Sequence, residues 1–465
     1  MPNTRTEKVD PLEIDTVGLL AKPRRRCHAP LALSCALNAV FAISLVMVLG
    51  TDWFPEVDRS REQCGGHGML YEGADECECF DCWSGPFCAE KLEGDACVVT
   101  ANSGTPYIFE EYWVRHPEAR TSILPSYHIG YGYRLPRLER AIRSLHKMVG
   151  NAEVDGREIV IGIGSTELIS AAMYALSGEL RDSSSTPTAT ASVWSQSPFY
   201  SGYKMPATFF DAKPFEWAVE SHDAGDHGLR VPEATATRPV IELVTSPNNP
   251  DGHTREPAVS PGPHSRYVLD HAYLWPHFTA IPRTPTAHGN DTIALFTLSK
   301  MTGHASTRIG WAICSNPIHA AKLTQFINTV TFGSPRENQL RAIAALEHVN
   351  AHHGEIFTFA RNLMLSRWQR LEEIFGGQSA YRLEPREAAS YDSFSEAEGY
   401  EPSPAYAWVE LVGGGDAAAA MAAAGITGRS GAEFGASPSF VRLELLMREE
   451  TFGLLTEKLR AMLHP

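Results

Sequence analysis

The interpretation of this chain depends on one stretch, Thr297-Leu-Ser-Lys300-Met-Thr-Gly-His-Ala-Ser-Thr-Arg308-Ile-Gly-Trp311. It contains a lysine directly after a serine, a short turn with a glycine, and an arginine eight positions after the lysine. A lysine amine can hold an aldehyde cofactor as a Schiff base, and an arginine with hydroxyl groups makes a phosphate site. The stretch therefore predicts an anchor for pyridoxal 5′-phosphate (PLP), against the alternative that Lys300 is an ordinary surface lysine.

The composition is typical of a globular protein with more than one folding unit. The 465 residues exceed one ordinary core, and 43% of them are hydrophobic while 20% are charged. The formal net charge of −15 argues against a nucleic-acid partner, because phosphate binding needs a clustered basic surface and no such face is visible in the sequence.

The amino-terminal segment predicts a membrane anchor. A polar tail with basic residues (1–30) precedes an uncharged apolar run (31–50), which as a helix would span about 30 Å and so cross a bilayer. Basic residues before the run and acidic residues after it favour a cytosolic amino terminus and a lumenal catalytic body. A cleaved signal peptide is the main alternative, and it would make the protein secreted or vacuolar. A buried core helix is disfavoured because no polar face interrupts the run.

Six cysteines are clustered between residues 60 and 98, namely Cys64, Cys77, Cys79, Cys82, Cys88 and Cys97. So short a segment cannot bury enough apolar surface to fold alone, so cross-links must stabilise it. Disulfides in an oxidising compartment are favoured over zinc, because paired C-x2-C knuckles are lacking, and no metal is expected. Spacing alone does not choose among the fifteen pairings that six cysteines allow.

From about residue 108 the sequence alternates helical patterns with short apolar runs. An amphipathic helix is expected at 138–149, and a buried strand at 158–163 leads through Ser165 and Thr166 into a helix at 167–176. A strand, a Gly-Ser-Thr turn and a helix direct backbone N–H groups at an anion, so this turn is a candidate phosphate site.

Further candidate residues lie at the ends of the next predicted strands. Tyr200 follows a strand at 191–194 and could stack on a planar ring. Asn249 follows a strand at 239–244, within an Asn-Pro-Asp-Gly turn. Asp270 and Tyr273 end a strand at 266–273, where ligands gather in open α/β sheets, and an aspartate there could pair with a protonated pyridine nitrogen. A strand at 292–297 then leads into Lys300.

This order of motifs resembles the fold-type I PLP-dependent aminotransferases, and longer strings narrow the resemblance to the alliinase and tryptophan aminotransferase-related family of plants. The strings are Phe109-Glu-Glu-Tyr-Trp113, Val244-Thr-Ser-Pro-Asn-Asn-Pro-Asp-Gly252, Leu298-Ser-Lys-Met-Thr-Gly-His304, Gly333-Ser-Pro-Arg-Glu-Asn-Gln-Leu-Arg341, Pro402-Ser-Pro-Ala-Tyr-Ala-Trp-Val409 and Phe440-Val-Arg-Leu-Glu-Leu445. The cysteine segment is similar to the EGF-like domain of alliinases, which implies the pairs Cys64–Cys77, Cys79–Cys88 and Cys82–Cys97.

The resemblance also implies a role for each candidate residue. Lys300 would form the imine with PLP and move the substrate α-proton, while Asp270 would hold the pyridine nitrogen. Asn249 and Tyr273 would bind the phenolic oxygen, and Tyr200 would stack on the ring. Arg442 would bind the substrate carboxylate as a bidentate fork. The phosphate would be held by Ser165, Thr166, Thr297, Ser299 and Arg308, with Tyr131 or Tyr133 of a second subunit of a homodimer.

The expected architecture is an α/β fold with a mixed, mostly parallel sheet and helices on both faces, followed by a smaller α+β domain. The predicted parts are a cytosolic tail (1–30), a transmembrane anchor (31–50), an EGF-like module (60–98) and a PLP domain (99–465). Within the last, the large domain covers about 120–330, and the small domain combines 99–119 with 331–465. Asn290 begins a glycosylation sequon, Asn290-Asp-Thr292.

Two reactions are compatible with these residues. The first is transfer of the amino group of an aromatic amino acid, L-tryptophan, to a 2-oxo acid, giving indole-3-pyruvate as in auxin synthesis; the predicted anchor favours it. The second is β-elimination from an S-alkyl-L-cysteine sulfoxide, as in alliinases. A third hypothesis, an inactive membrane-anchored binding protein, is disfavoured because Lys300, Asp270, Asn249, Arg308 and Arg442 are all present.

Overall fold

The computed structural model describes residues 62–69, 77–102, 104–116, 134–182, 190–209, 215–218, 231–286, 289–377 and 379–464. The predicted tail, the apolar span at 31–50, Tyr131 and Tyr133 lie outside these residues. Within the described part, no helix is both long and apolar enough to cross a bilayer.

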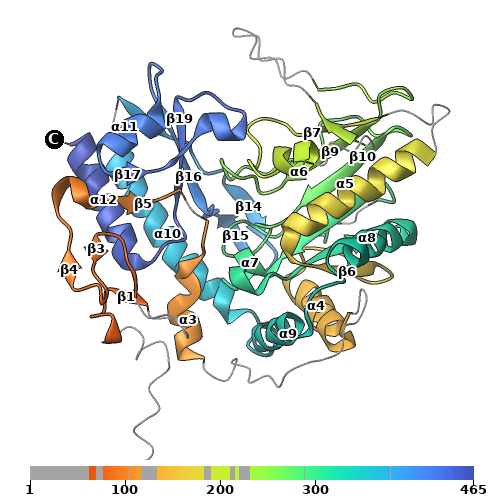
Figure 1. The fold of residues 1–465 in the computed structure, drawn as a ribbon, viewed down its shortest axis with the longest axis horizontal. Helices are drawn as coiled ribbons and strands as arrows, with labels where there is room; N and C mark the ends of the chain where they lie inside the picture. The colour runs from red at the N-terminus through yellow and green to blue at the C-terminus, as the bar shows by residue number, and fades with distance from the viewer. Residues whose placement is uncertain are drawn as a thin grey trace, which may run out of the picture. The chain divides into compact units, whose positions relative to one another are not determined.

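A seven-stranded sheet forms the centre of the fold (Figure 1). Its order is β6 (Glu158–Gly162), β12 (Gly310–Cys314), β11 (Thr292–Thr297), β10 (Ser265–Asp270), β9 (Val240–Thr245), β7 (Ala191–Trp194) and β8 (Phe215–Trp217). Only β12 runs against its neighbours, and the other adjacent pairs are parallel. This is the mixed, mostly parallel sheet that the sequence predicted.

Alternate residues of each central strand enter two different cores, because successive side chains point to opposite faces of a sheet. In β11, Ile293 and Leu295 pack with α5 (Gly164–Asp182) and α8 (Pro317–Val330), whereas Ala294 and Phe296 pack with α4 (Pro136–Val149). The helix α9 (Arg336–Ala351) lies against α4. Helices therefore cover both faces of the sheet (Figure 1).

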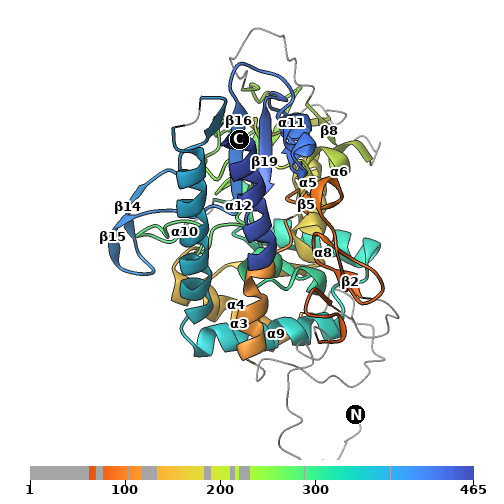
Figure 2. The ribbon, with the colours of Figure 1, turned by 90° about the vertical axis from the view of Figure 1, so that its left-hand side faces the viewer.

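A smaller sheet and its helices follow in the sequence. The four antiparallel strands are β13 (Tyr381–Leu383), β16 (Tyr406–Leu411), β19 (Phe440–Glu444) and β18 (Arg429–Ser430). The helices α10 (Glu355–Phe375) and α12 (Glu449–Leu463) lie side by side (Figure 2), and buried Arg367 of α10 donates to Glu449 of α12 at 2.9 Å. Shorter elements are α3 (Glu110–Arg115), α6 (Lys204–Phe209), α7 (Leu298–Met301), α11 (Ala417–Ala423), and the strand pairs β14 (Ala389–Asp392) with β15 (Ala397–Tyr400) and β5 (Val99–Thr100) with β17 (Ile426–Thr427).

The cysteine-rich segment forms a module of two short strand pairs, β1 (Gly68–Met69) with β2 (Glu78–Cys79) and β3 (Trp83–Ser84) with β4 (Glu90–Lys91). Its disulfides are Cys64–Cys77, Cys79–Cys88 and Cys82–Cys97, the pairs that the resemblance implied. These cysteines are therefore not available as zinc ligands. Arg448 lies 4.2 Å from the centre of the Phe80 ring, so the module packs against the catalytic body.

Candidate active site

A cavity of about 410 Å³ lies where the parallel strands β9, β10 and β11 end. Adjacent parallel strands present their carboxyl ends at one edge of a sheet, where ligands of α/β proteins bind. All the cofactor and substrate residues predicted above, apart from the two tyrosines outside the described residues, line this cavity: Ser165, Thr166, Tyr200, Asn249, Asp270, Tyr273, Thr297, Ser299, Lys300, Arg308 and Arg442. A larger hollow of about 530 Å³ beside α10 and β13 contains none of them.

Lys300 is held in the short helix α7, directly after β11. The helix begins after Thr297, whose hydroxyl oxygen accepts from the backbone N–H of Ser299 at 3.2 Å. The lysine Nζ donates to the carbonyl oxygen of Gly104. A Cβ atom at Gly104 would lie 2.5 Å from the Tyr406 hydroxyl and 3.2 Å from Nζ, so a side chain there would fill the space around the amine.

Asp270 provides a buried carboxylate at the end of β10. Only 3% of it is exposed, and its oxygens accept from the Tyr203 hydroxyl at 3.0 Å and the backbone N–H of Ala272 at 3.2 Å. Burial raises the pKa of Asp270 to about 6, because these two neutral donors compensate only part of the lost hydration. A cationic pyridine nitrogen is a partner that would favour the charged carboxylate. The hydrogen bond from the Ala272 N–H to the Asp270 carboxylate also turns the chain. The strand β10 therefore ends at Asp270, and Tyr273 lies beyond it, not within the strand as predicted.

The phosphate residues gather around the first turn of α5. The helix begins at Gly164, earlier than predicted, which places Ser165 and Thr166 at its amino end, where backbone N–H groups and the helix dipole attract anions. Gly164 has a φ of +74°, and a Cβ atom there would collide with the guanidinium of Arg308. The arginine and the helix end therefore face one space, together with the hydroxyl of Ser299.

A hydrogen-bonded chain joins the expected carboxylate and phenolic-oxygen sites. Arg442 of β19 donates to Oδ1 of Asn249 at 2.8 Å, and Nδ2 of Asn249 donates to the Tyr273 hydroxyl at 3.3 Å. The Tyr273 hydroxyl is also 2.9 Å from that of Tyr406. Arg442 lies 4.0 Å above the centre of the Tyr406 ring. The four side chains come from the loops after β9 and β10 and from the smaller sheet, so the site depends on both sheets.

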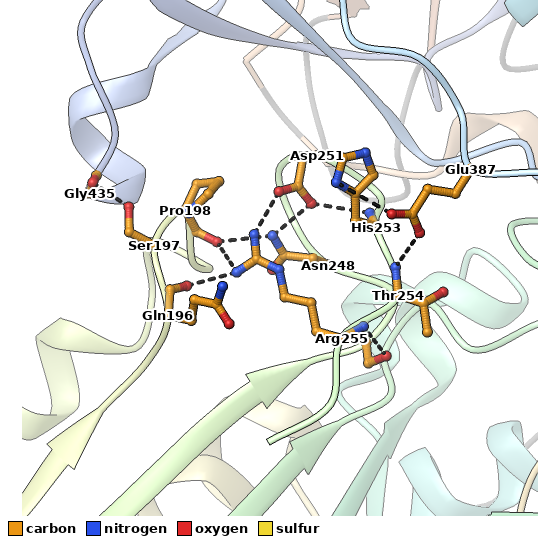
Figure 3. A network of polar contacts seen from close by, with 11 residues as sticks. Gln196, Ser197, Pro198, Asn248, Asp251, His253, Thr254, Arg255, Glu387 and Gly435 are labelled. Atoms are coloured by element: carbon orange, nitrogen blue, oxygen red, sulfur yellow. Dashed lines mark hydrogen bonds and ion pairs between the residues drawn. The ribbon is translucent and has the colours of Figure 1, made fainter. Parts of the chain in front are cut away.

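A second network, beside the site, fixes the loops that carry Tyr200 and Asn249 (Figure 3). Arg255 donates to the carbonyl oxygens of Gln196 and Pro198 at 2.8 Å each, and to Asp251 at 2.7 Å. Asn248 donates to the Pro198 carbonyl at 3.0 Å and to Asp251 at 2.8 Å. The Asn-Pro-Asp-Gly turn is therefore hydrogen-bonded to the loop that carries Tyr200.

Several residues of the cavity were not predicted as site residues, among them Asn102, Gly104, Thr105, Thr245, Tyr406 and Arg429. Tyr203, which binds Asp270, was also missed. Tyr406 lies within a string that carried the family resemblance, and Tyr203 follows Tyr200 by one turn, so both had a signal in the sequence. The segment 102–105 had none, because it lies between the cysteine module and α3 without periodicity or motif. Asn290 is exposed in the turn before β11, whereas Thr292 of its sequon is buried.

The side chains of the cavity suit both ends of the PLP molecule. A buried carboxylate whose partners among the described residues are neutral fits the pyridine nitrogen, and a helix amino end with Arg308 fits the phosphate. The Lys300 amine, directly after β11 in the same cavity, fits the aldehyde. The fold and the site together define a PLP-dependent enzyme of fold type I.

The comparisons with known proteins agree with this class and narrow it. The family model described as "Allinase" matches residues 99–463. Tryptophan aminotransferase-related protein 3 of Arabidopsis thaliana is 35% identical over 456 residues, covering 92% of this chain and 96% of that protein. Alliin lyase 2 of Allium sativum is 33% identical over 412 residues, covering 85% and 83%. The chain belongs to the alliinase and tryptophan aminotransferase-related family.

Solved structures share the fold at low sequence identity. An aminotransferase from Staphylococcus aureus superposes with a TM-score of 0.55 at 17% identity, covering 79% of this chain and 94% of that one. A Thermus thermophilus aspartate aminotransferase mutant gives a TM-score of 0.54 at 16% identity, covering 79% and 92%. At this level of sequence identity, the two structures support the fold and not a particular reaction.

Proposed function

We propose that this protein is an aminotransferase that moves the amino group of an aromatic L-amino acid to a 2-oxo acid. The observation that carries the proposal is the buried pair of Arg442 and Asn249 in the same cavity as Lys300 and Asp270. The guanidinium of Arg442 is suited to bind the carboxylate of an amino acid. The Lys300 amine, which can carry a proton, lies in the same cavity.

When bound, PLP supplies an aldehyde that takes the amino group and a ring that accepts electrons. The chain's own residues then divide the remaining tasks. Arg442 would orient the substrate by its carboxylate, and Asp270 would pair with the pyridine nitrogen and favour its protonated form. Asn249 and Tyr273 would bind the phenolic oxygen, and the Lys300 amine would take the substrate α-proton and hold it for return.

For the amino donor we propose L-tryptophan, with indole-3-pyruvate as product. Support comes from the relatives whose names contain tryptophan aminotransferase and which match nearly the whole chain, at 92% and 93% coverage. The second candidate is carbon–sulfur elimination, which the 33% identity to an alliin lyase favours. Both reactions begin with the same proton removal by Lys300, so the residues that bind PLP do not distinguish them.

Product analysis with the full-length holoenzyme separates the two. L-Tryptophan with a 2-oxo acid should yield indole-3-pyruvate and the corresponding amino acid in equal amounts, without ammonia. An S-alkyl-L-cysteine sulfoxide should release little pyruvate or ammonia. Rapid release of both from the sulfoxide, with no transfer from tryptophan, would reject the proposal in favour of the lyase.

The sequence also supports a proposal for assembly and location. We propose a homodimer in which Tyr131 or Tyr133 reaches the other subunit's phosphate, held at a membrane by residues 31–50 with the catalytic body in the lumen of the secretory pathway. Sedimentation of the holoenzyme and carbonate extraction of membranes test the two parts separately. A monomeric active enzyme, or release of the intact chain by carbonate, would contradict them.

A further inference from the structure

A second arginine faces the cavity beside the one expected for the substrate carboxylate. Arg429 of β18 is paired directly with Arg442 of β19 in an antiparallel register, so both side chains lie on the same face of the sheet. Both line the cavity. Like charges directly opposite each other destabilise a strand pair, so this arrangement costs stability unless an anion lies between or beside the two guanidiniums.

The charges of the cavity leave Arg429 without a task in the reaction as described. Among the described residues that line it, the cationic side chains are Lys300, Arg308, Arg429 and Arg442, and the one carboxylate is Asp270. The cofactor aldehyde, the cofactor phosphate and the substrate α-carboxylate account for Lys300, Arg308 and Arg442, and the pyridine nitrogen for Asp270. Arg429 is therefore the one cationic group of the described cavity lining to which the reaction assigns no partner, and within the protein it pairs with Glu433 at the rim.

The contacts of Arg429 place it at the rim of the cavity. Its Nη1 donates to the Ser201 hydroxyl at 3.2 Å, and its Nη2 is 3.2 Å from a carboxylate oxygen of Glu433. The arginine side chain is 35% exposed and that of Glu433 is 45% exposed, so solvent weakens this ion pair. Both guanidiniums also lie near one ring, because the centre of Phe434 is 5.1 Å from Arg442 and 6.0 Å from Arg429.

We propose that Arg429 binds the second carboxylate of a dicarboxylic 2-oxo acid, and so selects the amino acceptor. This inference rests on the proposed aminotransferase function. With the α-carboxylate on Arg442, a short dicarboxylate reaches the guanidinium on the neighbouring strand, where it can accept paired hydrogen bonds. When the aromatic donor occupies the cavity, Glu433 and Ser201 hold Arg429 at the rim.

Binding of unreactive acids tests the inference without turnover. Titration calorimetry on the full-length holoenzyme compares glutarate, which has two carboxylates, with butyrate, which has one. We expect glutarate to bind about 10- to 100-fold more tightly than butyrate, and Arg429→Gln to bring this ratio close to one. Arg429→Lys, which keeps the charge without the fork, should give an intermediate ratio.

Glu433→Gln is the matched control, because it removes the negative charge that pairs with Arg429 at the rim and leaves the described cavity lining intact. It should bind glutarate at least as tightly as the unaltered enzyme does. Equal binding of glutarate and butyrate by the unaltered enzyme would overturn the inference. So would an Arg429→Gln variant that weakens both acids equally, since that result indicates a structural role.

Acceptor kinetics separate this inference from the function on which it rests. With L-tryptophan as donor, Arg429→Gln should lower the ratio of kcat/KM for 2-oxoglutarate over pyruvate by about 10- to 100-fold. If both acceptors serve equally in both proteins, the inference fails and the aminotransferase stands. If no acceptor supports transfer while glutarate binding still depends on Arg429, the aminotransferase fails and the dicarboxylate site stands.

Discussion

Arg442 donates to Oδ1 of Asn249 at 2.8 Å, and both side chains are at least 98% buried. Asn249 also donates to the Tyr273 hydroxyl at 3.3 Å. The Asn249 side-chain amide therefore connects Arg442, expected to bind the substrate carboxylate, with Tyr273, expected to bind the cofactor's phenolic oxygen. A substrate carboxylate on Arg442 and a cofactor oxygen near Tyr273 are thereby held in a fixed relation. Because buried hydrogen-bond partners depend on each other, a change at Asn249 should affect both sites.

Asn249→Ala should weaken the amino acid and the cofactor together. The variant leaves Arg442 without this acceptor and Tyr273 without this donor, and each loss is expected to cost about 1–3 kcal/mol. We expect KM for the amino donor to rise about 10- to 100-fold and the visible spectrum of bound PLP to change its pH dependence. Arg442→Lys is the control: it should raise KM by a similar factor while the spectrum without substrate stays the same. An Asn249→Ala enzyme altered only in KM would contradict the shared role.

Lys300→Ala should abolish turnover and the covalent attachment of PLP. The amine is the group that can form the imine and carry the proton, so its removal is expected to lower kcat by several orders of magnitude. Absorbance spectroscopy and reduction with borohydride followed by mass measurement of residues 297–311 provide the test. Reduction should attach PLP to this peptide in the unaltered enzyme and to no peptide of the variant. An adduct on another lysine of the unaltered enzyme, or a variant that keeps its kcat, would remove Lys300 from its role.

Asp270→Asn should stabilise the cofactor-free protein at high pH while it impairs catalysis. Burial raises the pKa of Asp270 from 3.8 to about 6 in the folded protein, so the folded state holds a proton between these values that the unfolded chain has lost. The stability that this proton contributes is present below pH 4 and is lost as pH rises through 6. Relative to wild type, the variant should therefore gain about 1–3 kcal/mol between pH 4 and pH 8.

Urea unfolding of both cofactor-free proteins at several pH values measures this difference. A difference between variant and wild type that does not change with pH would show that Asp270 is ionised throughout. With PLP bound, the order should reverse, because the charged carboxylate then has a cationic partner.

Loss of the Cys82–Cys97 disulfide should destabilise the protein more than loss of Cys79–Cys88. Cys82 and Cys97 belong to the same apolar core as residues of the catalytic body, whereas the other pair lies within the module. Removing a disulfide from a small secreted module costs about 2–5 kcal/mol. Thermal unfolding compares two double variants, in which both cysteines of one disulfide are replaced by alanine. The decrease in Tm should be larger for the Cys82 and Cys97 variant than for the Cys79 and Cys88 variant. Equal decreases would indicate that the module does not contribute to the stability of the body.

The sequence predicted the central sheet because its signal is local. The strands β7 and β11 have the predicted bounds, since each is a short buried run whose apolar residues enter two cores. Lys300, Asp270 and Asn249 were found in the same way, because a polar residue after a buried strand lies at the sheet edge.

The remaining parts of the site depend on contacts between distant segments. Gly104 lies against Lys300 across nearly two hundred residues of sequence, and no pattern around 102–105 indicates this contact. Arg429 became a candidate only through its register with Arg442, which a short strand of two residues does not encode locally. Pairing between strands, and not propensity, therefore decided which arginines share the cavity.

A single-turnover measurement distinguishes amino transfer from elimination in one experiment. The full-length holoenzyme is mixed with excess L-tryptophan without any 2-oxo acid, and the oxo acid and ammonia released are quantified per active site. Amino transfer predicts one equivalent of indole-3-pyruvate, no ammonia, and resumed turnover when a 2-oxo acid is added. Continuous release of ammonia without an acceptor, or no release of indole-3-pyruvate at all, would contradict amino transfer from L-tryptophan.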